Sequence, residues 1–81
     1  MVSPEQVEAI IKSGLPDAQV QAMSPDGEHY EVIVVSSAFA GKGRVQQHQL
    51  VYKALGEVLN TGVLHAVSLK TFTPEDWAAL S

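Results

Sequence analysis

The stretch from His29 to Leu59 constrains the fold more than any other part of the chain, because it joins an apolar strand, a glycine turn and a helix. Its first part, residues 32–35, is β-branched and apolar without alternation, which is typical of a strand that is central or covered on both faces. Glycines in residues 40–43 permit a tight turn. A helix is then expected from about residue 44 to 59, with an apolar stripe of Val45, Val51, Ala54, Leu55, Val58 and Leu59.

The segment before this stretch predicts a helix and a hairpin. The helix is expected to start at Ser3-Pro4-Glu5-Gln6, which can form a capping box, and to end at Gly14. Residues 17–23 alternate apolar and polar side chains, as a half-exposed strand does. A Pro-Asp-Gly turn joins this strand antiparallel to a second strand, His29–Ser37.

The segment after the long helix predicts a third strand. Residues 63–65 are expected to form a half-strand that leads into the strand Ala66–Phe72. A helical crossover makes this strand parallel to the second one. Residues 73–80 begin with the same kind of helix-start signal as the first helix. The short helix that they form should pack against the rest of the domain through Trp77, Ala78 and Leu80. The order predicts one α+β domain over residues 1–81, with helices on one face of a three-stranded mixed sheet.

Composition narrows the class of protein. The chain has 81 residues, 46% hydrophobic and 17% charged, which is typical of a single globular domain. It has no cysteine, so it can offer neither a disulfide nor a thiolate ligand. No apolar run approaches the roughly 20 residues that span a bilayer, and no signal peptide is evident. We therefore expect a cytoplasmic protein.

Charge is unevenly distributed along the chain. The net charge of −4 argues mildly against a general nucleic-acid binder. Yet Lys42, Arg44 and Lys53 all fall between Glu31 and Glu57, and no acid lies between those two residues. This basic element is either a solvated helix face or a surface for a partner.

The sequence contains no recognisable catalytic motif. It lacks a serine elbow and a phosphate-binding glycine loop, and its acidic residues suit caps and turns, so we expect no enzymatic activity. His48 falls at the margin of the predicted helix stripe, where a partly buried, hydrogen-bonded histidine is the plainer interpretation.

Two further histidines could form half of a metal site. His29 begins the second strand and His65 precedes the third, so parallel pairing would bring both to the same end of the sheet. Either they are unrelated exposed residues, or they supply two nitrogens to a metal. Two external thiolates would then complete a His₂Cys₂ set of the Rieske type.

Several blocks of the sequence together resemble the BolA-like family: Val34-Val35-Ser36, Phe39-Ala40-Gly41-Lys42, Gln47-His48-Gln49-Leu50-Val51, Leu64-His65-Ala66 and Lys70–Trp77. The resemblance implies a class II KH-like fold, α-β-β-α-α-β with a short C-terminal helix. It also implies a non-enzymatic adaptor that binds a monothiol (Cys-Gly-Phe-Ser) glutaredoxin and shares a bridging [2Fe–2S] cluster with it and with glutathione. His65 matches the family's C-terminal cluster ligand, and His29 is the best match for the second ligand. Such an adaptor would act in iron–sulfur cluster trafficking or in iron and redox regulation.

The alternative that the resemblance leaves open is a DNA-binding transcriptional regulator. Lys42, Arg44, His48 and Lys53 are the candidate contacts with nucleic acid or with a protein partner. Glutamines flank His48 where many relatives have arginine, and the turn lacks the Gly-x-x-Gly spacing of RNA-binding KH domains. Both features weaken the nucleic-acid alternative, and a homodimer is also left open.

Overall fold

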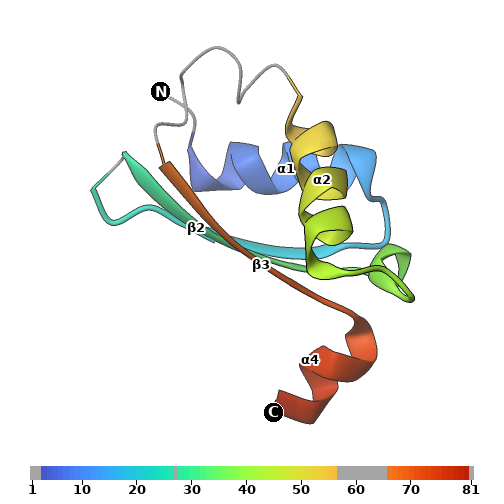
Figure 1. Ribbon diagram of the computed structural model, residues 1–81. Coiled ribbons are helices and arrows are strands. Elements are labelled where there is room, and N and C mark those ends of the chain that lie inside the picture. Colours follow the sequence, from blue (N-terminus) through green and yellow to red (C-terminus); the bar gives the residue numbers. More distant parts are fainter. Residues whose placement is uncertain (1–2, 27, 57–65, 81) are drawn as a thin grey trace.

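The computed structural model describes residues 3–26, 28–56 and 66–80. They form α1 (Pro4–Gly14), β1 (Gln19–Met23), β2 (His29–Val35), the 3₁₀ helix η1 (Ser37–Phe39), α2 (Arg44–Leu55), β3 (Ala66–Phe72) and α4 (Pro74–Leu80). The sheet order is β1-β2-β3, with β1 antiparallel and β3 parallel to β2. Helices α1 and α2 lie on one face of the sheet, and α4 extends away from the end of β3 (Figure 1). The predicted α+β fold with a mixed sheet is confirmed.

The core lies between this face of the sheet and the two helices. Alternate residues of β2, namely Tyr30, Val32 and Val34, point inward and are at most 1% exposed. The helices and η1 meet them with Val7, Ile11, Val51, Leu55 and Phe39. β2 is thus the central strand that its apolar run predicted.

Helix α1 covers the sheet and also makes a hydrogen bond to the edge strand β1. It begins with the predicted capping box, in which Ser3 Oγ accepts from the N–H of Gln6 (3.1 Å) and Gln6 Oε1 accepts from the N–H of Ser3 (2.8 Å). Further along, Glu8 Oε2 accepts a hydrogen bond of 3.0 Å from the N–H of Ala22 in β1. The carboxylate therefore satisfies a backbone donor of an edge strand.

A carboxylate also links the start of β1 to the end of β2. Asp17 accepts from Ser36 Oγ (2.8 Å) and from the N–H of Ser37 (3.0 Å), and it also bonds Ser37 Oγ. These bonds, the one from Ser37 Oγ first, lower the pKa of Asp17. Strand β2 accordingly ends at Val35, two residues before the predicted end at Ser37, because Ser36 caps η1.

Two predictions about α2 are wrong. Val45 is 71% exposed, since it lies six positions before Val51 and so points about 120° away from it around the helix. The helix ends at Leu55, because Gly56 adopts φ +53° as its C-cap. Residues 57–59, the predicted half-strand 63–65 and the extra helical turn before β3 lie outside the described residues.

Three residues of α4 were predicted to pack on the body of the domain, and of these Trp77 contacts the sheet. The rings of Trp77 and Phe72 lie 5.2 Å apart between centroids. Ala78 is exposed and Leu80 is 66% exposed, so the prediction that they pack on the body is wrong. None of the helices in the described parts of the chain has the length and apolar character that a bilayer crossing requires.

The close approach of α1 and α2 predicts the effect of Gly14→Ala. A Cβ at Gly14 would lie 2.7 Å from Ala54 Cβ, a rigid neighbour. Overpacking costs about 1–3 kcal/mol, against the roughly 1 kcal/mol that alanine gains over glycine in a helix. We expect urea denaturation to show a net loss of about 1 kcal/mol. In an Ala54→Gly background the same change should become stabilising; an unchanged cost there would show that the contact with Ala54 is not the cause.

The Asp17 network predicts a pH-dependent contribution to stability. Because folding lowers the pKa of Asp17, the contribution is present above the unfolded-state pKa and is lost as the pH falls through the folded-state value. Asp17→Asn should therefore reduce the free energy of unfolding at neutral pH, and this deficit should be smaller at about pH 3, below the ordinary aspartate pKa. Denaturant titrations at both pH values measure this, with Glu31→Gln on the exposed sheet face as control. A pH-independent deficit would contradict the assignment.

Candidate metal-ligand site at the sheet end

The candidate site lies at the end of the sheet where β2 begins. His29 is the first residue of β2, and its partner in the parallel register with β3 is Ala66. His65 lies outside the described residues, although it immediately precedes Ala66 in the chain. The predicted parallel pairing of the two strands is thus confirmed, and the ligand role of each histidine stays a prediction.

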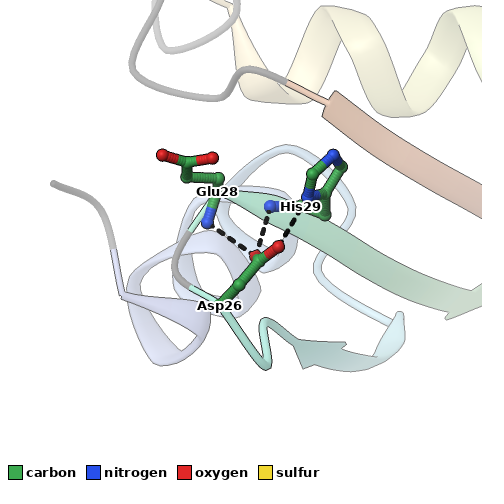
Figure 2. A network of polar contacts seen from close by, with 3 residues as sticks. All are labelled: Asp26, Glu28 and His29. Atoms are coloured by element: carbon green, nitrogen blue, oxygen red, sulfur yellow. Dashed lines mark hydrogen bonds and ion pairs between the residues drawn. The ribbon is translucent and has the colours of Figure 1, made fainter.

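The turn before β2 holds the His29 side chain by a single carboxylate (Figure 2). Asp26 Oδ1 accepts from the backbone N–H groups of Glu28 (2.9 Å) and His29 (2.8 Å). Asp26 Oδ2 lies 2.6 Å from Nδ1 of the imidazole. One side chain thus fixes the backbone of the turn, as aspartate in an Asx turn does, and also the orientation of the ring.

These contacts determine which ring nitrogen carries a proton. The backbone N–H of His29 first, and then its ring, lower the pKa of Asp26, so the carboxylate is ionised at neutral pH and can only accept. Nδ1 must therefore be the donor. The hydrogen bond and the charge of Asp26 in turn raise the pKa of His29 above its ordinary value.

The arrangement leaves one nitrogen ligand facing solvent. The His29 side chain is 69% exposed, and Figure 2 shows Nε2 directed away from Asp26. Within residues 3–26, 28–56 and 66–80, no three His, Cys, Asp or Glu side chains are grouped to hold a metal ion. What the described residues provide is an accessible, oriented imidazole and not a closed site.

The four basic residues predicted to bind a partner do not form one patch. Arg44 and His48 line a groove between α2, β3 and α4, which also contains Lys70 and Leu80. Lys53 instead lines a separate hollow beside the C-terminal end of α1, with Ser13, Gly14, Leu15, Leu50 and Ala54. Lys42 is exposed in the turn before α2. Arg44 and His48 thus line one groove and Lys53 lines another, while the binding role of all four residues stays a prediction.

The immediate contacts of His48 and Gln47 are also resolved. His48 is half-buried, as predicted, and its ring makes an edge contact with Tyr52 at 6.4 Å between centroids. Gln47 Nε2 donates to the carbonyls of Phe39 (3.2 Å) and Lys42 (2.9 Å), and its Oε1 accepts from Thr71 Oγ1 (2.7 Å). Gln47 thus joins the turn before α2 to β3.

Sequence reasoning missed Asp26 and Lys70 as members of these surfaces. The signal for Asp26 was present, since an aspartate in a turn three residues before a histidine can bond both the backbone and the ring. Lys70 joins Arg44 and His48 only through the fold, because α2 crosses beside β3.

The chain is thus a small α+β domain with an exposed histidine positioned at one end of its sheet. Residues 2–76 match the model of the BolA-like protein family. The chain is 37% identical over 73 residues to the acid stress protein IbaG of Escherichia coli K12, which covers 90% of this chain and 86% of that protein. A BolA homologue from Coxiella burnetii has a TM-score of 0.85 at 37% identity, covering 96% of this chain and 99% of that one.

These matches show that the chain belongs to the BolA-like family. A shorter match, 43% identical over 51 residues, is to the DNA-binding transcriptional regulator BolA of Haemophilus influenzae. It covers 63% of this chain and 48% of that protein.

Proposed function

We propose that this protein is a non-enzymatic adaptor that binds a monothiol glutaredoxin and contributes histidine ligands to a bridging [2Fe–2S] cluster. The observation that carries the proposal is His29: its Nδ1 is occupied by Asp26 and its Nε2 is accessible at the start of β2. Such a role would serve iron–sulfur cluster trafficking or iron and redox regulation in the cytoplasm.

The register of the sheet supports a second ligand from the same end. Ala66 is paired with His29, and His65 is covalently bound to Ala66.

The available donors fit a shared cluster better than a resident metal. The chain has no cysteine, and its described residues hold no group of three metal-binding side chains. Two imidazoles are half of the His₂Cys₂ set of Rieske-type centres, so the thiolates must come from the partner and glutathione. The cluster, when bound, would supply redox-active iron, while this chain's part is to present imidazole nitrogens in a fixed orientation.

The first experiment titrates the protein into a monothiol glutaredoxin that carries a glutathione-ligated [2Fe–2S] cluster. Visible circular dichroism should show a new spectrum that saturates at an equimolar ratio. His65→Ala and His29→Ala should each lose the new spectrum or weaken the complex by about 10-fold or more, as loss of a ligand does.

Gln21→Ala is the control, because Gln21 is an exposed residue of β1 with no proposed part in ligation or partner binding. It should leave the spectrum unchanged. If the wild-type protein produced no new spectrum, or if both His65→Ala and His29→Ala behaved as wild type, cluster co-ligation would be wrong.

DNA binding is the second candidate function. A relative named as a DNA-binding regulator supports it, together with the groove in which Arg44, His48 and Lys70 lie. Cations along a groove suit phosphate contacts, which make affinity fall with salt. The net charge of −4 opposes this function, so the attraction of the groove for DNA phosphates must exceed the repulsion from the rest of the acidic surface.

Fluorescence anisotropy with duplex DNA at several salt concentrations tests this candidate. If the groove binds phosphates, Arg44→Ala and Lys70→Ala should each reduce the slope of log affinity against log salt by about one. Lys53→Ala is the control, since Lys53 lines a different hollow. No binding at low ionic strength, or an equal effect of all three variants, would eliminate the groove as a DNA site.

A further inference from the structure

We propose that Asp26 is a positioning residue that fixes His29 in the Nδ1–H tautomer, so that Nε2 is the only ring nitrogen with which His29 can ligate iron. This inference rests on the proposed cluster-binding function and specifies the ligand atom and the residue that selects it. Asp26 itself does not contact the metal.

The geometry of the turn carries the inference. Asp26 uses both carboxylate oxygens: Oδ1 accepts from two backbone N–H groups, and Oδ2 accepts from the ring at 2.6 Å. A side chain held at two points by the backbone cannot follow the ring if the ring turns. The imidazole is therefore tied to a rigid acceptor and not to a mobile one.

The chemistry of the acceptor excludes the other tautomer. An ionised carboxylate has no proton to give, so the nitrogen that faces it must be protonated and has no lone pair to offer a metal. An unconstrained neutral imidazole exchanges between both tautomers. Asp26 holds the ring in one tautomer, in which the lone pair of Nε2 is free. Carboxylates that do not themselves bind the metal orient metal-binding histidines in the same way.

The neighbouring charge does not provide an alternative acceptor. Glu28 donates its backbone N–H to Asp26, but Figure 2 shows no contact between its carboxylate and the imidazole. Asp26 is thus the group to change.

Asp26→Asn is the informative variant, because it should preserve the turn while inverting the tautomer. The amide Oδ1 can still accept from both backbone N–H groups. Its Nδ2 then replaces Oδ2 and, as a donor, can bond only an unprotonated Nδ1. The proton moves to Nε2, where it blocks the proposed ligand atom. Asp76→Asn in α4 is the control for the same chemical change.

Two measurements test the proposal. Long-range ¹H–¹⁵N correlation spectra of the free protein, recorded where the ring is neutral, should show Nδ1–H in wild type and Asp76→Asn and Nε2–H in Asp26→Asn. In the glutaredoxin titration, Asp26→Asn should weaken the cluster-bridged complex by about 10- to 100-fold. Backbone amide spectra report whether the turn is preserved.

Four results would overturn the proposal, and they are distinguishable from one another. Mixed tautomers in wild type would show that Asp26 does not fix the ring. A complex of Asp26→Asn as tight as wild type would show that Asp26 does not select the ligand nitrogen, and a tighter one would show that Asp26 competes with iron. If His29→Ala itself left the complex unchanged, His29 would not be a ligand, and the proposed function of His29 would fail together with this inference.

Discussion

Burial of the inward face of β2 is the constraint on which the rest of the structure depends. Val32 and Val34 are at most 1% exposed, and burying such a side chain contributes about 1.5–3 kcal/mol. A single hydrogen bond contributes only about 0.5–1.5 kcal/mol. A slip of one residue would turn this whole face to solvent, so packing, and not the exposed turn contacts, fixes the register. That register is what pairs His29 with Ala66.

The exposed network around Asp26 therefore depends on the core without supporting it. Its members are solvent-accessible, so their contacts are screened and add little to global stability. Their effect is local and geometric, since they set the orientation of one imidazole. Stability and function thus rest on different residues, which is why Asp26 can be changed without an expected loss of the fold.

Much of the fold was predictable because the strong patterns are local. The apolar run of β2, the capping box at Ser3 and the crossover to β3 each follow from neighbouring residues. The errors arose where apolar composition was followed in place of the exact helical spacing and the glycine signal. Val45 matched the apolar composition of a stripe but not its angle on the helix, and Gly56 ended α2 within an otherwise helical pattern. For the site, His29 was found from its place at the start of a strand, whereas its partner Asp26 required the hydrogen bonds of the turn to be known.

The contact between Glu8 and Ala22 has a consequence for assembly. Open-ended polymers of sheets need two free edges on every subunit, because each added strand must present another edge to the next. Here the carboxylate occupies a donor of β1 that an incoming strand would need. An incoming strand would have to displace this carboxylate before it could pair with β1 at Ala22, so the contact disfavours growth of the sheet through that edge.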